Sequence, residues 1–366
     1  MNNRHYILRG MVALAVVVSI ASCSKKDQLV SAPSEGKALL TPGKYEDGII
    51  LINEGWFGHD NGNVNFYKYG RDTIEQMVYQ LENPGNQLGV TTQSGAVWDG
   101  KLYIMAKQGP LVVTDSKTLV ETGRIATLPA DGRAFLGLTS TTGLISTLDG
   151  VYNLNLSPLS VGSKLSGISG ETGTMRKEGN YIFILSQSEG LIILNATTKA
   201  IVKKIAGLQQ GLCKTSDGSL WIAGGSTLAR LNVTTLDTTR ITMPFSLGNP
   251  WFAWNEGTVT CSTIDTAVYL ARTNSWGAGG NRLYKYIPGN LASLSTPLAT
   301  LPANQEFYGA GVRYDPSQHN LVVTAVQSGY GQNYKYNKLY FYSTNGSLTK
   351  TISYEYFYFP ALPVFN

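Results

Sequence analysis

Residues 178–195, EGNYIFILSQSEGLIILN, contain the pattern that decides the fold. A turn at Glu178-Gly179-Asn180 precedes the apolar run Tyr181-Ile-Phe-Ile184, and a short polar loop leads to a second run, Gly190-Leu-Ile-Ile-Leu-Asn195. Short apolar runs separated by turn residues are typical of antiparallel β-strands. This segment therefore predicts two neighbouring strands of one sheet.

The second of these strands has counterparts along the whole chain, each opening on Gly, Ser or Asn. The seven copies are residues 62–67, 109–114, 150–155, 190–195, 226–231, 281–286 and 337–342. Their third residues lie 36 to 56 positions apart. Turns such as Asp99-Gly100 and Asp217-Gly218, placed between apolar residues, predict hairpins upstream of several copies. Each unit is therefore expected to hold four antiparallel strands.

Repeated units of about 40–50 residues with four strands predict the blades of a β-propeller. The fold class is therefore all-β, with seven blades over residues 48–366. Blade 1 lacks a first strand, and residues 356–364 can supply it and close the ring. Tandem β-sandwiches are the alternative, but they need units of about 100 residues.

Composition excludes several other classes of protein. The 366 residues are 43% hydrophobic and only 14% charged, which excludes a chain that is mainly disordered. The net charge of +5 is small and no run of Lys and Arg occurs, so a nucleic acid is not expected as a partner.

The N-terminus has the features of an export signal. Arg4 and Arg9 precede an apolar run that is too short to span a bilayer comfortably. The run ends in Ile20-Ala-Ser-Cys23, which resembles a bacterial lipobox and implies cleavage before Cys23 and lipidation of its sulfur. An ordinary signal peptide is the alternative. We predict a signal peptide over 1–22, a lipidated flexible tether over 23–47, and an outer-membrane protein that faces the cell exterior.

Two further cysteines remain, Cys213 and Cys261, and both fall in predicted strands. Outside the cytoplasm they can form a disulfide, and two buried free thiols are the equal alternative. Their spacing matches no metal site, and no metal or cofactor is expected.

In a propeller, the loops between the second and third strands share one face with the connections between blades. The longer of these segments, such as 54–61, 326–336, 243–256 and 303–309, carry aromatic residues beside glycines and amides. Exposed rings on loops are suited to covering a ligand. The predicted ligand-binding residues are Trp56, Phe57, His59, Gln87, Gln108, Gln187, Trp251, Trp276, Tyr308, Tyr330 and Tyr334.

Other aromatic and acidic residues have simpler interpretations. Trp98, Trp221 and Tyr269 lie within strand patterns and are expected in the core, whereas Trp254 and Phe307 fit either role. No nucleophile, phosphate-binding or dinucleotide motif is present, so no catalytic residue is assigned and a non-enzymatic protein is expected. Paired loop carboxylates leave a glycoside hydrolase as an alternative; the candidates are Glu54, Asp149, Glu171, Glu189, Glu256 and Glu306.

The opening Leu51-Ile-Asn-Glu-Gly55, followed by Gly62-Asn63 and a Phe-Tyr strand, resembles the YncE-like surface lipoproteins. The closing Phe359-Pro-Ala-Leu-Pro363 is similar to the C-terminal end of that family. The resemblance covers residues 48–366 and implies a seven-bladed propeller that binds cobalamin and passes it to a TonB-dependent outer-membrane transporter of the BtuB type. It transfers no individual binding residue.

We therefore expect a surface lipoprotein that captures a corrinoid, such as cobalamin (vitamin B12), on its loop face. The expected partners are the corrinoid, the transporter and the membrane that holds the lipid anchor. A glycan-binding surface protein and a surface adhesin are the alternatives, followed by the propeller hydrolase.

Overall fold

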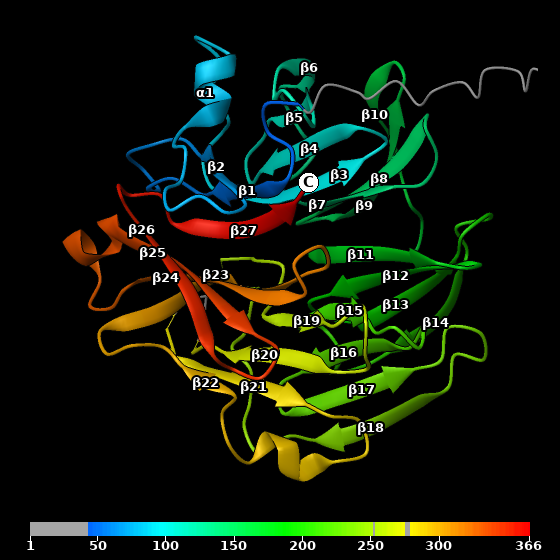
Figure 1. Ribbon diagram of the computed structural model, residues 1–366. Coiled ribbons are helices and arrows are strands. Elements are labelled where there is room, and N and C mark those ends of the chain that lie inside the picture. Colours follow the sequence, from blue (N-terminus) through cyan, green and yellow to red (C-terminus); the bar gives the residue numbers. More distant parts are fainter. Residues whose placement is uncertain (1–42, 252, 275–278) are drawn as a thin grey trace, which may run out of the picture. The chain divides into compact units, whose positions relative to one another are not determined.

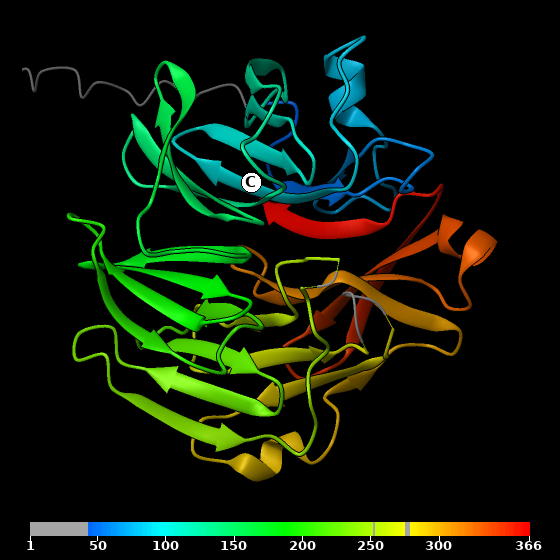
Figure 2. The same ribbon diagram turned by 180° about the vertical axis from the view of Figure 1, so that it is seen from behind.

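The computed structural model describes residues 43–251, 253–274 and 279–366. Within these residues the chain forms seven antiparallel sheets that follow one another around a common centre (Figure 1). Seen from behind, the same cyclic order runs in the opposite sense (Figure 2). The predicted all-β, seven-bladed propeller is thus confirmed.

Blades 1 to 3 contain the first ten strands and the last one. Blade 1 is formed by β27 (Pro360–Phe365), β1 (Gly48–Asn53) and β2 (Asn63–Lys68). Blade 2 is formed by β3 (Thr92–Trp98), β4 (Lys101–Ala106), β5 (Leu111–Asp115) and β6 (Glu121–Ile125). Blade 3 is formed by β7 (Gly132–Gly137), β8 (Thr142–Thr147), β9 (Gly150–Leu156) and β10 (Leu159–Lys164).

Blades 4 and 5 continue the ring in sequence order. Blade 4 is formed by β11 (Thr172–Glu178), β12 (Tyr181–Ser186), β13 (Gly190–Asn195) and β14 (Ile201–Ile205). Blade 5 is formed by β15 (Leu212–Lys214), β16 (Leu220–Gly224), β17 (Thr227–Leu231) and β18 (Thr238–Thr242).

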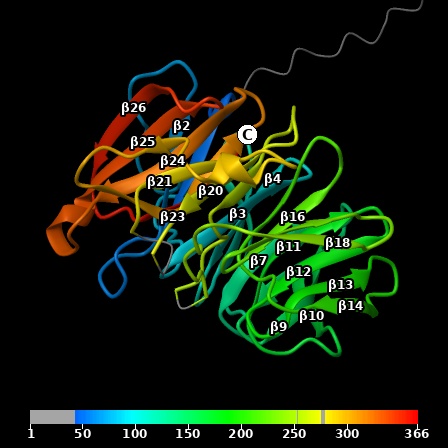
Figure 3. The same ribbon diagram turned by 90° about the horizontal axis from the view of Figure 1, so that it is seen from below.

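Blades 6 and 7 complete the set. Blade 6 is formed by β19 (Val259–Cys261), β20 (Val268–Arg272), β21 (Arg282–Tyr286) and β22 (Ala299–Thr300). Blade 7 is formed by β23 (Gln305–Asp315), β24 (Asn320–Gln327), β25 (Tyr336–Ser343) and β26 (Leu348–Glu355). In Figure 3, β26 of blade 7 and β10 of blade 3 lie at opposite ends of the molecule.

Helical structure is confined to connections. The described helices are α1 (Val78–Glu82), η1 (Leu291–Leu294) and η2 (Gly331–Lys335). Helix α1 belongs to the connection from blade 1 to blade 2 and projects from the ring (Figure 1). No helix of the described residues has the length and hydrophobicity needed to cross a membrane.

The seven repeated strands of the sequence occupy equivalent places, because each forms the third strand of its blade. Blade 1 takes its innermost strand from the other end of the chain. Ile50 pairs with Val364 and Leu51 pairs with Pro363, so β27 lies antiparallel to β1 and closes the ring. In Figure 1 the red β27 runs beside the blue β1. The predicted closure by the C-terminal strand is confirmed.

Apolar side chains fill the space between neighbouring blades. The ring of Tyr103 in blade 2 stacks on Phe135 in blade 3, with centroids 3.9 Å apart. Trp221 of blade 5 meets Tyr286 of blade 6 edge-on at 5.4 Å. Trp221 and Tyr269 are buried, as expected from their place in strand patterns, whereas Trp98, expected in the core as well, is only partly buried. Each large side chain buried in this way contributes about 1.5–3 kcal/mol to folding.

Cys213 and Cys261 form a disulfide between β15 and β19, the innermost strands of blades 5 and 6. Their Cα atoms lie 5.5 Å apart, and the bond closes a segment with a sequence separation of 48. Of the two alternatives left open by the sequence, the structure therefore selects the cross-link between neighbouring blades.

The segment before β1 packs on the propeller. Tyr45 is fully buried, and its backbone N–H donates to the carbonyl of Lys117 at 2.8 Å. Residues 43–47, which the sequence analysis assigned to the tether, thus lie against blade 2. The signal peptide, Cys23 and residues 24–42 lie outside the described residues.

Candidate ligand-binding site

The innermost strands begin at the connections between blades, so these connections share one face with the loops between second and third strands. We call this the loop face. At the junction of blades 7 and 1, four segments of the loop face surround a hollow of about 340 Å³. It is lined by Glu54, Gly55, Trp56, Phe57, Tyr308, Tyr330, Gly331, Tyr334 and Phe359, and we call it the aromatic pocket.

The backbone around Glu54 continues the pairing of β1 with the C-terminal segment. The N–H of Glu54 donates to the carbonyl of Phe359 at 3.0 Å, and the N–H of Gly55 donates to Tyr358 at 3.1 Å. Gly55 has φ +74°, and a Cβ there would lie 2.3 Å from the carbonyl oxygen of Asn61. Only glycine suits this position, which turns the chain from β1 into the pocket wall.

Three rings form the packed base of the aromatic pocket. The centroids of Tyr308, Tyr334 and Phe359 lie 5.5 to 5.9 Å from one another in edge-on arrangements. Tyr330 lies 5.5 Å from Tyr334 but leaves 70% of its surface exposed, and Phe57 leaves 68% exposed. The pocket therefore combines a fixed aromatic base with two rings whose apolar surface faces solvent.

Trp56 is held at the edge of this pocket by two stacking partners. The centroid of its ring lies 4.0 Å from the imidazole of His59 and 4.2 Å from the ring of Phe357. Offset stacking of this kind fixes ring orientation. His59 thus supports Trp56 from the side and is not among the residues that line the pocket.

Glu54 is the acidic group of the aromatic pocket. Its carboxylate accepts hydrogen bonds from Gln93 Nε2 and from the hydroxyl of Tyr308, each at 3.2 Å. Burial raises the pKa of Glu54 to about 7, and the two hydrogen bonds oppose that rise. The group therefore changes charge near neutral pH.

A second tyrosine–carboxylate contact lies behind the aromatic base. The hydroxyl of Tyr334 donates to Glu306 Oε1 at 2.7 Å. Burial and this carboxylate both raise the pKa of Tyr334, so its hydroxyl stays protonated and remains a donor.

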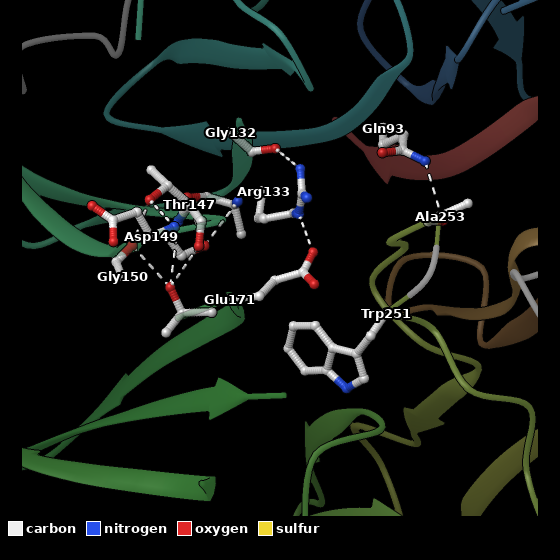
Figure 4. A network of polar contacts seen from close by, with 12 residues as sticks. Gln93, Gly132, Arg133, Thr147, Asp149, Gly150, Glu171, Trp251 and Ala253 are labelled. Atoms are coloured by element: carbon white, nitrogen blue, oxygen red, sulfur yellow. Dashed lines mark hydrogen bonds and ion pairs between the residues drawn. The ribbon is translucent and has the colours of Figure 1, made fainter. Parts of the chain in front are cut away.

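The connection between blades 5 and 6 covers the centre of the loop face. Gln93 Nε2 on β3 of blade 2 donates to the carbonyl of Ala253 at 3.4 Å, so this connection reaches across the ring axis (Figure 4). Arg133 Nε donates to Glu171 Oε1 at 2.6 Å, and both side chains are almost fully buried. Figure 4 shows Trp251 beside this pair. Ser94 of β3 also donates to Glu256 Oε1 at 3.2 Å, so two contacts join this connection to blade 2.

The structure brings together five of the predicted ligand-binding residues: Trp56, Phe57, Tyr308, Tyr330 and Tyr334 all line the aromatic pocket. Gln87, Gln108 and Gln187 are exposed on other loops and do not line it. Trp276 lies outside the described residues.

Trp251 has a different place from the one expected. Only 3% of its surface is exposed, and its Nε1 donates to the carbonyl of Gln209 at 3.1 Å. A Cβ on Gly173 would lie 3.0 Å from this ring and 2.5 Å from Trp254, so a glycine in β11 makes room for both indoles. The predicted surface role of Trp251 is therefore corrected to a core role, and Trp254 and Phe307 are buried as well.

Sequence reasoning missed Phe357 and Phe359. They belong to the connection from β26 to β27, which lies on the loop face because β27 is the innermost strand of blade 1. The predicted closure of the ring by a C-terminal strand could have indicated this, because the residues that precede an innermost strand lie on the loop face.

Within the part of the chain that the structure describes, no group of three or more His, Cys, Asp or Glu side chains is placed to hold a metal ion.

The family described as "Domain of unknown function (DUF5074)" matches residues 47–366. The chain belongs to the DUF5074 family. The match begins next to β1 and ends with the chain, so the DUF5074 domain coincides with the seven-bladed propeller, including the strand that closes it. A search of curated proteins found no match to this DUF5074 chain.

Proposed function

We propose that this DUF5074 protein is a lipid-anchored surface protein that captures a corrinoid on the loop face and delivers it to a TonB-dependent outer-membrane transporter. The observation that carries the proposal is the aromatic pocket, in which six aromatic rings surround one carboxyl group. The resemblance of the opening and closing motifs to YncE-like surface lipoproteins supports the choice of ligand.

The chemistry of a corrinoid suits this pocket. A corrinoid is a broad disc with an apolar ring and a rim of amides, and a hollow of about 340 Å³ can admit one edge of it. Phe57 and Tyr330 would cover the ring, since each aromatic side chain can bury about 150–250 Å². The carboxyl group of Glu54, which lines the pocket, is an acceptor for amide N–H groups.

The disulfide between Cys213 and Cys261 supports a location outside the cytoplasm. Disulfides form and persist in oxidising compartments and are rare in the cytosol. This agrees with the export signal and lipobox that the sequence predicts.

The proposal is tested by titrating the chain without residues 1–23 with cobalamin and with cobinamide, which lacks the nucleotide tail. Heat of binding and the visible spectrum of the corrinoid are followed together. One-to-one binding of both compounds would support the proposal and place recognition on the corrin ring. Absence of binding at high micromolar concentrations would refute the choice of ligand.

Variants then test the pocket itself. Phe57→Ala and Tyr330→Ala should each weaken corrinoid binding, because each removes an exposed ring that the ligand would cover. Leu148→Ala is the matched control, since Leu148 is an exposed apolar side chain in the corresponding loop of blade 3. Equal affinity in all three variants would exclude the aromatic pocket as the binding site.

A saccharide is the second candidate ligand, because exposed rings beside a carboxylate also suit stacking on a sugar. This alternative predicts weak binding to polymeric glycans and none to corrinoids. Turnover of a glycan that is lost in Glu54→Gln would instead assign a hydrolase, for which a carboxyl group with a raised pKa is required.

A further inference from the structure

A second hollow lies at the end of the ring opposite the loop face. It has a volume of about 370 Å³ and is lined by residues 96–98, 135–138 and 175–177. Residues 96–98 end β3, residues 135–138 include the end of β7 and the residue after it, and residues 175–177 lie just before the last residue of β11. The hollow therefore lies next to the tight turns of blades 2, 3 and 4. We call it the turn-side pocket.

The walls of the turn-side pocket are mainly apolar and fixed in place. The indole of Trp98 lies against Gly137, where a Cβ would come within 2.2 Å of the ring. Trp98 Nε1 donates to the carbonyl of Thr139 at 3.0 Å, which fixes the orientation of the indole. Val97 leaves 37% of its surface exposed beside it. Apolar surface of this kind, left open in a concave place, marks a binding site for an apolar group.

Positive charge borders this apolar surface. Arg176 and Lys177 line the pocket, and Lys177 is exposed. Arg176 Nε donates to Glu178 at 2.7 Å, and Lys214 Nζ lies 2.5 Å from the same carboxylate. Three cationic side chains in this group are therefore balanced by one carboxylate, which leaves positive charge at one side of the pocket.

We propose that the turn-side pocket binds a small amphipathic anion, a compact apolar body that carries one sulfonate or carboxylate. The apolar body would lie against Trp98 and Val97, and the anionic group would lie beside Arg176 and Lys177. The site is separate from the aromatic pocket, so this proposal stands independently of corrinoid capture.

The test uses the chain without residues 1–23 and two probes of similar shape. One is the anion 8-anilinonaphthalene-1-sulfonate, and the other is N-phenyl-1-naphthylamine, which lacks the sulfonate. The anion should bind at one site, followed by its fluorescence, at least about tenfold more tightly than the neutral probe. Equal affinity for the two probes, or no binding of the anion, would overturn the proposal.

Variants locate the bound anion. Val97→Glu places a negative charge on the pocket wall at an exposed position and should weaken binding of the anion at least about tenfold. Val202→Glu in β14 is the matched control, because Val202 is also an exposed strand valine, at 48%, and it should leave binding unchanged. Unchanged binding in Val97→Glu would overturn the proposal. So would loss of binding in Phe57→Ala, which would place the anion in the aromatic pocket.

The same variants distinguish the two proposals. Val97→Glu should retain any corrinoid binding of the parent chain, whereas Phe57→Ala should retain binding of the anion. Failure of one ligand to bind therefore leaves the result for the other unaffected.

Discussion

The hydroxyl of Tyr308 donates a hydrogen bond to Glu54 Oε2 at 3.2 Å, across 254 positions of sequence. Tyr308 belongs to β23, the first strand of blade 7, and Glu54 follows β1 of blade 1. The contact thus joins the two blades that meet where the ring closes, and it does so inside the aromatic pocket. The stability of the closure and the chemistry of the pocket depend on the same carboxyl group.

The raised pKa of Glu54 predicts a pH dependence of folding. Because its pKa is about 7 in the folded state and 4.5 ordinarily, the folded chain binds more protons than the unfolded chain between these values. The contribution of Glu54 to stability is therefore fully present below pH 4.5 and is lost as pH rises to about 7. The loss should be about 1–3 kcal/mol, since Glu54 keeps part of its surface open. Urea unfolding at a series of pH values from 4.5 to 8 measures this loss. In Glu54→Gln the unfolding free energy should no longer fall over this pH range through residue 54. If the unfolding free energies of the parent chain and of Glu54→Gln changed with pH in the same way, the burial of this carboxyl group would be contradicted.

Tyr308→Phe should raise the pKa of Glu54 further, because it removes a donor that favours the charged carboxylate. The midpoint of the pH dependence described above should move upward. At pH 8, where Glu54 is ionised, unfolding should require about 1 kcal/mol less. If Tyr308→Phe leaves this midpoint unchanged, the hydrogen bond from Tyr308 to Glu54 does not form in solution.

Breaking the buried ion pair of Arg133 and Glu171 should lower the free energy of unfolding far more than breaking an exposed ion pair. Glu171→Ala leaves an arginine charge buried without its partner and should cost about 3–5 kcal/mol of unfolding free energy. Asp72→Ala, which breaks an exposed pair with Lys350 and no other ion pair or hydrogen bond of the described residues, is the matched control and should change the unfolding free energy little. Chemical denaturation of both variants gives the comparison, and similar losses would contradict the assigned burial.

Loss of the disulfide should destabilise the protein without changing its fold. The bond closes a segment with a sequence separation of 48, for which chain entropy gives about 4 kcal/mol. Cys213→Ser with Cys261→Ser should lower unfolding free energy by about 2–4 kcal/mol while the circular dichroism spectrum stays that of a β-protein. No change between reducing and non-reducing conditions in the parent chain would mean that the two thiols are not joined in solution.

Sequence patterns predicted the parts of this molecule that depend on local periodicity. The repeated third strands were visible because each alternates apolar residues after a turn residue, and the closing strand followed from the incomplete blade 1. Five rings of the aromatic pocket were predicted because the loops between second and third strands share one face with the connections between blades. Trp251 was misplaced because its connection folds inward onto Gly173, a contact that no local pattern encodes. The pKa of Glu54 likewise depends on burial by distant segments.

The pairing of β1 with β27 also sets the order in which the protein can assemble. Strand β1 is synthesised before β27, so its inner edge stays without a partner until residues 360–365 arrive. An open edge of this kind can pair with another chain. A chain that ends before residue 360 therefore lacks β27 and exposes the inner edge of β1, so a truncated chain should aggregate more readily than the full one.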